Sequence, residues 1–119
     1  MWPPLRLAWN LLVLAILYAE PVPAQERTVL PAPPEELLAS PTRIVLQLPD
    51  TGGVTINHQP ISWQRLAAAL RAIYAMRPVK VLLVEAGPQR TREELERVRQ
   101  LADRQGIRVY AANREGIRR

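Results

Sequence analysis

The segment from residue 79 to residue 111 constrains the fold most, because it reads as a strand, a helix and a second strand in direct succession. Val79–Val84 is an almost unbroken run of Val and Leu, which is typical of a strand covered by other parts of the fold. Thr91 and Glu94 have the capping-box spacing that begins a helix, and Gly106 suits the residue just beyond its end. Ile107–Ala111 then alternates apolar and polar residues. This β-α-β unit predicts two parallel strands joined by a right-handed crossover.

A hairpin and another helix are expected before this unit. Arg43–Leu48 and Val54–Asn57 each alternate in hydropathy, and the turn-forming residues 49–53 lie between them. Ser62 is a suitable N-cap for a helix from Trp63 to about Met76. The predicted order is therefore β-β-α-β-α-β. It describes an α+β or α/β domain with a mixed four-stranded sheet and two helices on one face.

Proline sets the expected limits of this domain. Seven of the twelve prolines precede residue 41, and proline favours extended chain. Residues 25–41 are thus predicted to be a semi-rigid linker, in which residues 35–38 could form one helical turn. The folded domain is expected at residues 42–113, followed by a basic tail at 114–119. A domain of about 70 residues buries a smaller share of its surface than a larger domain does, which favours self-association into a homodimer.

The first 24 residues are typical of an export signal. Arg6 precedes the apolar run Leu7–Ala19, and Val22 and Ala24 fit the small-x-small cleavage pattern. Cleavage would leave Gln25 first. A retained membrane anchor and a buried helix of the fold are the alternatives, although the apolar run is shorter than the roughly 20 residues needed to cross a membrane. A cleaved export signal predicts a protein released into the periplasm, and a retained anchor predicts a periplasmic domain held at the inner membrane.

The composition agrees with export and limits the chemistry. The chain has no cysteine, so neither disulfides nor thiol chemistry are available. Its net charge is +5, but export makes nucleic acid an improbable partner. Arg114, Arg118 and Arg119 could contact an anionic glycan or lipid, or could simply be a solvated tail.

No pattern of catalytic residues is apparent. His58 is the only histidine, and no nucleophile or orienting carboxylate is spaced to work with it. Glu93, Glu94 and Glu96 are better explained by helix capping and a solvated helix face. The sequence therefore predicts no enzyme, no metal site and no cofactor.

Four residues are candidates for an interface. Val45 and Gln47 alternate with the apolar side of their strand and so face away from it. Trp63 and Tyr110 are either packing residues or amphipathic contact residues of the kind that anchor interfaces. A face or edge of the sheet is expected to remain open to a partner.

The ordered set of elements resembles the periplasmic domain of the ExbD/TolR family of biopolymer-transport proteins. The resemblance covers about 70 residues. It is carried by short segments in the family's order, which are Ile44–Leu48, Gly53–Asn57, Gln59–Ser62 leading to Leu66 and Leu70, Val79–Ala86, and Leu95–Ala102 leading to Gly106 and Ile107. The resemblance implies a dimeric envelope module that contacts an ExbB/TolQ-like or TonB/TolA-like partner, or peptidoglycan.

Three departures limit what the resemblance implies. Gly87 follows Ala86 where the family usually has an Asp, and Gln100 aligns with another family Asp. No Asp occurs before Asp50, whereas the family's membrane helix carries an Asp that handles protons. An ionisable group inside a membrane helix is usually functional, and here Glu20 lies only at the end of the apolar run.

These observations favour a non-enzymatic periplasmic adaptor in an envelope transport or energy-transduction complex. A membrane-anchored, proton-driven motor subunit is the first alternative, and a small cell-wall enzyme is the second.

Overall fold

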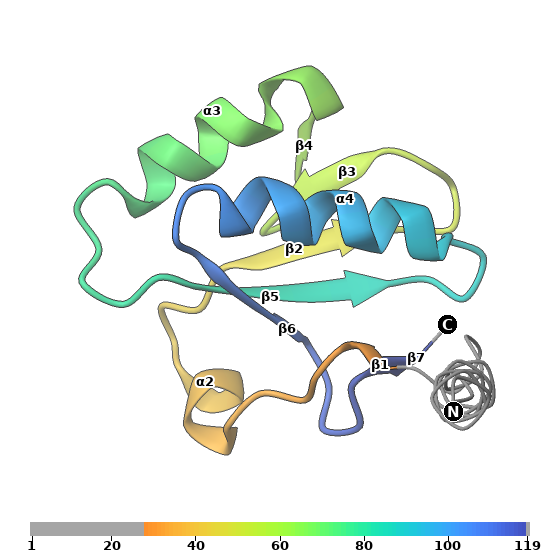
Figure 1. The fold of residues 1–119 in the computed structure, drawn as a ribbon, viewed down its shortest axis with the longest axis horizontal. Coiled ribbons are helices and arrows are strands. Elements are labelled where there is room, and N and C mark those ends of the chain that lie inside the picture. The colour runs from red at the N-terminus through yellow and green to blue at the C-terminus, as the bar shows by residue number, and fades with distance from the viewer. Residues whose placement is uncertain (1–27, 119) are drawn as a thin grey trace, which may run out of the picture.

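The computed structural model describes residues 28–118, which form a mixed α+β fold (Figure 1). A five-stranded mixed sheet has the strand order β4-β3-β2-β5-β6, and a separate two-stranded sheet pairs β1 with β7. The elements in chain order are β1 (Thr28–Leu30), α2 (Glu35–Ala39), β2 (Val45–Leu48), β3 (Val54–Ile56), β4 (Gln59–Ile61), α3 (Trp63–Tyr74), β5 (Val81–Ala86), α4 (Arg92–Asp103), β6 (Arg108–Ala111) and β7 (Ile117–Arg118).

The predicted strand directions are confirmed. β2 and β3 are antiparallel, with Leu46 opposite Ile56. β5 pairs in parallel with β6, as the β-α-β unit requires, and also in parallel with β2 on its other side. Because β5 lies at the centre between two parallel neighbours, it is the most apolar strand of the sheet.

The prediction of four strands is wrong, because β4 forms a second hairpin with β3. Asn57 and His58 both have positive φ, 48° and 66°, as in the two-residue turns that join tightly paired antiparallel strands. β4 is an edge strand with β3 as its partner in the sheet, and Pro60 is tolerated there because an edge position has no need of an amide donor. The sequence pattern does not indicate this turn, because His58 stands where Gly is usual.

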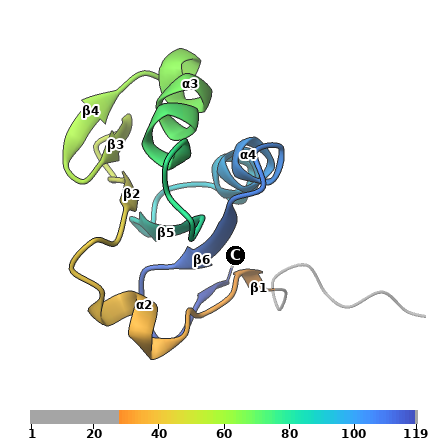
Figure 2. The ribbon, with the colours of Figure 1, turned by 90° about the vertical axis from the view of Figure 1, so that its left-hand side faces the viewer.

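Helices α3 and α4 cover the same face of the five-stranded sheet (Figures 1 and 2). The side chain of Ser62 accepts a hydrogen bond from the backbone N–H of Arg65, and the Thr91–Glu94 capping box begins α4; both predicted caps are confirmed. The core between helices and sheet is aliphatic apart from Tyr74. Its central residues are Leu46, Leu48, Leu66, Leu70, Leu82, Val84, Leu95, Val98, Ile107 and Ala111.

The folded unit extends beyond both limits expected from the sequence. Thr28–Leu30 pairs with Ile117–Arg118, and Val29, Leu30 and Ile117 are buried. β1 contacts α4 and β6, and the amide of Ala111 donates to the carbonyl of Pro31 at 2.8 Å. Part of the proposed linker and part of the proposed tail therefore belong to the fold. Local pattern missed this pairing because it joins segments almost ninety residues apart.

The opposite face of the five-stranded sheet is covered less completely. Helix α2, which matches the helical turn expected at residues 35–38, lies on the side away from α3 and α4 (Figure 2). None of the helices within residues 28–118 is long and apolar enough to cross a membrane. The predicted export signal lies outside the described residues.

Candidate functional site

A groove crosses the sheet face that α3 and α4 leave open. It has a volume of about 500 Å³ and is walled on one side by Leu38 of α2. Its lining comes from α2, the segment before β2, strands β2 and β5, the β3–β4 turn and the residue after β6; the residues are Leu38, Pro41, Arg43, Val45, Gln47, Asn57, His58, Leu83, Glu85 and Ala112. We call this hollow the sheet groove. A second hollow, which shares Gln47, His58 and Glu85 with it, continues toward Gly87.

Gln47 lies at the centre of the sheet groove and is 7% exposed. Its Oε1 accepts hydrogen bonds from Thr55 Oγ1 at 2.5 Å and from the backbone N–H of His58 at 3.0 Å. A backbone N–H can only donate, so the carboxamide is fixed with its oxygen toward the β3–β4 turn. Its Nε2 has no hydrogen-bond partner among residues 28–118.

A buried amide donor without a partner is unfavourable by roughly 1–3 kcal/mol. Most buried polar groups in native proteins are paired with protein or ordered water. The Nε2 of Gln47 therefore offers an acceptor group of a partner a hydrogen-bond donor inside the sheet groove.

The rim of the sheet groove carries one charge of each sign. Arg43 is exposed and donates to the carbonyl of Ser40 at 2.9 Å, and Glu85 is exposed on β5. At the β3–β4 turn, Asn57 Oδ1 accepts the amide of Val45 at 2.9 Å, which fixes that end of the wall. Neither sign of charge dominates, so the sheet groove is not suited to a purely anionic or cationic ligand.

The structure brings together three of the four predicted interface residues on one face. Val45 and Gln47 line the sheet groove. Tyr110 is half-buried on the same face, because it alternates with the buried Val109 and Ala111 of β6. Trp63 does not belong to this face, because it packs against the core on the helix side. The guanidinium of Arg97 lies over its ring, 4.6 Å from the ring centroid.

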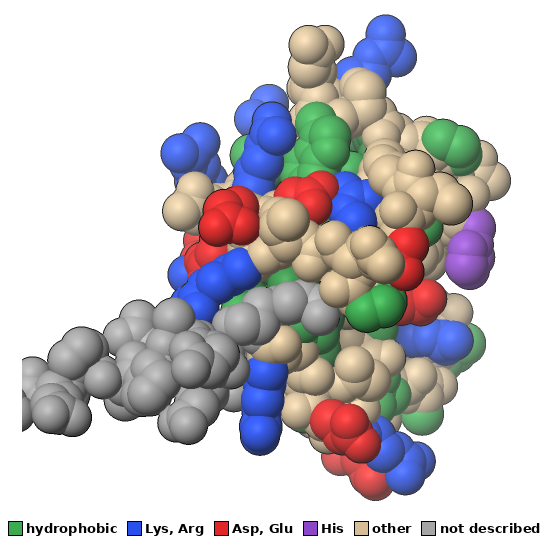
Figure 3. Space-filling view, turned by 90° about the vertical axis from the view of Figure 1, so that its right-hand side faces the viewer, with side chains coloured by type: hydrophobic (Ala, Val, Ile, Leu, Met, Phe, Trp, Pro, Cys, Tyr) green, Lys and Arg blue, Asp and Glu red, His purple; other side chains and the backbone are tan. Residues whose placement is uncertain are grey.

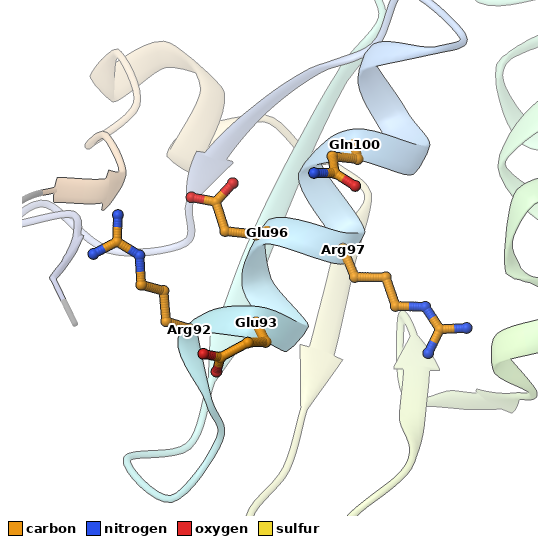
Figure 4. Close-up of a pocket in the computed structure, with 5 residues that line it drawn as sticks. All are labelled: Arg92, Glu93, Glu96, Arg97 and Gln100. Carbon is orange, nitrogen blue, oxygen red and sulfur yellow. The ribbon is translucent and has the colours of Figure 1, made fainter.

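The candidate catalytic residues are dispersed. His58 is exposed in the β3–β4 turn, and the single histidine projects from the molecular surface in Figure 3. Glu93 and Glu96 lie on the outer side of α4 with Arg92, Arg97 and Gln100 (Figure 4). No group of three or more His, Cys, Asp or Glu able to hold a metal occurs in the described part of the chain.

Glu94 has a structural partner that sequence reasoning missed. It forms an ion pair with Arg90, which is 7% exposed and also donates to the carbonyls of Pro49 and Gly53, each at 2.8 Å. Hydrogen bonds from Arg90 and then from the Thr91 backbone lower the pKa of Glu94 to about 2. Arg90 thus ties the β2–β3 loop to the start of α4. No local pattern distinguishes Arg90 from the fourteen other arginines.

The structure places the two described residues of the predicted anion contact in different segments. Arg114 and Arg118 are exposed, the first in the β6–β7 connection and the second on β7. Arg119 lies outside the described residues. Figure 3 shows positive and negative side chains interspersed over the end of the molecule that it presents.

Comparison with known proteins adds no family assignment. No protein-family model matches the sequence, and no curated protein matches it significantly.

Proposed function

We propose that the protein is a non-enzymatic binding module that docks a partner polypeptide in the sheet groove. One observation carries this proposal: the buried Nε2 of Gln47 lacks a partner while its Oε1 is held in place by two donors. Such a donor is preorganised for an incoming acceptor, and preorganisation favours binding because little ordering is left to be done.

The chemistry of the sheet groove favours a peptide segment as the ligand. The wall combines apolar side chains such as Val45 and Leu83 with an amide donor and opposite charges on Arg43 and Glu85. A polypeptide in extended form presents apolar side chains and backbone carbonyls together. A backbone carbonyl would accept from Gln47.

The sheet edges support a second mode of association, which is dimerisation by strand pairing. Pro60 lies in edge strand β4 and has no amide to donate, which disfavours pairing there. β6 forms the other edge of the sheet, next to β5. The Pro31 carbonyl accepts the amide of Ala111 at the end of β6. The homodimer would pair along the rest of the outer edge of β6.

On the basis of the resemblance to the ExbD/TolR family, we propose that this binding activity serves an envelope transport or energy-transduction complex of the periplasm. The partner would be an ExbB/TolQ-like or TonB/TolA-like protein, with peptidoglycan as the other ligand that the resemblance implies. A membrane-anchored motor subunit of the ExbD/TolR type remains the principal alternative. It is disfavoured because no Asp precedes Asp50, and identification of Met1 as the N-terminal residue of the envelope protein would favour it. A small cell-wall enzyme is the second alternative, and activity of the purified protein on peptidoglycan would support it.

The Gln47→Glu variant tests the docking proposal. It removes both Nε2 donors but keeps an oxygen for Thr55 and His58. Gln64→Glu is the matched control, because Gln64 is exposed on α3 and lies on the helix side of the molecule. Partners recovered from the cell envelope with each tagged full-length variant would be quantified by mass spectrometry, and melting would confirm that both variants are folded.

We expect a specific envelope protein to be recovered with the wild type and with Gln64→Glu, and to be depleted at least about tenfold with Gln47→Glu. Equal recovery with both variants would contradict docking in the sheet groove. Sedimentation of the full chain tests the dimer separately, and a monomer at all concentrations would exclude it.

A further inference from the structure

We propose that a second site, at the end of the molecule where α3 and α4 finish, binds a phosphate-type oxyanion through Arg71, Lys80 and Arg104. These side chains come from three different elements. Arg71 lies in the last turn of α3, Lys80 immediately precedes β5, and Arg104 caps the C-terminus of α4. All three line one hollow of about 330 Å³, and no residue of this hollow is shared with the sheet groove.

The hollow has an uncompensated positive charge. None of its lining residues is Asp or Glu. The ion pairs found among residues 28–118 join Arg90 to Glu94 and Arg99 to Glu96, so neither involves the three cations of the hollow. Like charges held close together repel each other, and an anion bound between them would remove this repulsion.

Helix capping explains the cluster only in part. A cation near the C-terminus of a helix interacts favourably with the helix dipole, which accounts for Arg71 and Arg104 taken one at a time. Lys80 lies at the start of a strand and has no such role. A role in binding an anion would explain why Lys80 lines the same hollow as the two arginines.

Hydrogen bonds hold together the three elements that carry the cations. Gln105 Nε2 donates to the carbonyl of Ala67 at 2.8 Å and so ties the end of α4 to α3. The Tyr74 hydroxyl donates to the carbonyl of Val81 at 2.6 Å and ties α3 to β5. Burial raises the pKa of Tyr74 to about 12, so this hydroxyl stays neutral and adds no negative charge to the hollow.

The donor set favours phosphate over a carboxylate. Two guanidinium groups can each offer a pair of parallel N–H donors, and an ammonium adds a compact charge. A phosphate has more acceptor oxygens and a higher charge than a carboxylate, so it offers more acceptors to a set of three cationic side chains. The phosphate could be free in solution or carried by a lipid headgroup.

Titration of the full chain with inorganic pyrophosphate at constant ionic strength tests the site. The double variant Arg71→Gln with Arg104→Gln removes two of the three cations. Arg65→Gln with Arg99→Gln is the matched control, because these exposed arginines line no part of the hollow and the same formal charge is removed. A parallel arm measures binding to vesicles of phosphatidic acid, with phosphatidylcholine vesicles as reference.

We expect binding of pyrophosphate to weaken at least about tenfold in the Arg71/Arg104 variant and to change little in the control. An equal loss of binding to phosphatidic-acid vesicles in the Arg71/Arg104 variant would show that the site also accepts the phosphate of a lipid headgroup. If neither pyrophosphate nor phosphatidic acid distinguishes the two double variants, the proposal is overturned, because general charge attraction would then explain any binding.

Discussion

At the residue scale, single side chains join segments that the sequence keeps apart. Arg90 connects the β2–β3 loop to α4 through two carbonyls and one carboxylate, and Gln47 organises the β3–β4 turn. Both are polar and more than nine-tenths buried. Buried polar side chains of this kind specify local geometry because every hydrogen bond they lose leaves a group unpaired.

Arg90→Ala is expected to destabilise the fold by about 1–3 kcal/mol, because the carbonyls of Pro49 and Gly53 would lose a charged donor. Urea denaturation measures the change. Arg99→Ala is the control, since its ion pair with Glu96 is half exposed and surface pairs contribute about 0–1 kcal/mol. Equal effects of the two substitutions would contradict the structural role of Arg90.

Gly87 is one of the positions where the sequence departs from the ExbD/TolR pattern, and the structure gives a physical reason for glycine there. A Cβ at this position would collide with the carboxylate of Asp50 and lie 3.0 Å from the Asp50 nitrogen. That carboxylate accepts the amide of Gln89 at 2.9 Å. We expect Gly87→Ala to destabilise the fold, and to do so less in an Asp50→Ala background. Additive effects in a double-mutant cycle would contradict this packing.

At the element scale, the start of α4 makes stability depend on pH, because Glu94 accepts hydrogen bonds from Arg90 and from the Thr91 backbone. Glu94 has a pKa of about 2 in the folded state, below its ordinary value of 4.5. The carboxylate therefore favours the folded state when it is charged. This stabilisation is fully present above about pH 5 and is lost as the pH falls toward 2.

The Glu94→Gln variant should therefore be less stable than the wild type at pH 7. Its melting temperature should also fall less than that of the wild type between pH 5 and pH 2. Thermal melting across this range measures both effects. Glu93→Gln is the control, because Glu93 is exposed in the same turn of α4. A pH profile for Glu94→Gln identical to that of the wild type would contradict the assignment.

Elements with a strong local pattern could be predicted from the sequence, and elements defined by distant pairing could not. Local chemistry predicts the N-caps at Ser62 and Thr91. It also predicts the end of α4 near Gly106, which has a φ of 71°. β4 has three residues with Pro60 in the middle, and β7 has only two. Such short strands have no measurable period. Alternation predicts that Val45 and Gln47 share the sheet face opposite the helices, whereas the contribution of α2 to the groove wall depends on the tertiary fold.

At the scale of the whole molecule, the two ends of the described chain close the fold on each other. β1 and β7 pair beyond the β6 edge and contribute Val29, Leu30 and Ile117 to the core. This pairing joins the segment that follows the predicted export signal to the C-terminal residues. The domain therefore depends on residues that composition alone assigns to a linker and a tail.

Ile117→Ala is expected to destabilise the protein by about 2–5 kcal/mol, because it empties a buried position between β1 and the core. Val79→Ala should change stability by less than about 0.5 kcal/mol, since Val79 is 62% exposed. Chemical denaturation of the full chain compares the two. An equally small effect at Ile117 would show that the β1–β7 pair does not belong to the cooperative unit.

We propose that the partner binds in the sheet groove and not on the helix side of the molecule. The most direct measurement places a photo-crosslinking amino acid at Val45 or at Gln64 of the full chain in the cell envelope, with and without Gln47→Glu. The account predicts a crosslink to a partner polypeptide from position 45 that Gln47→Glu abolishes, and none from position 64. A crosslink from position 64 alone, or one from position 45 that is unaffected by Gln47→Glu, would contradict it.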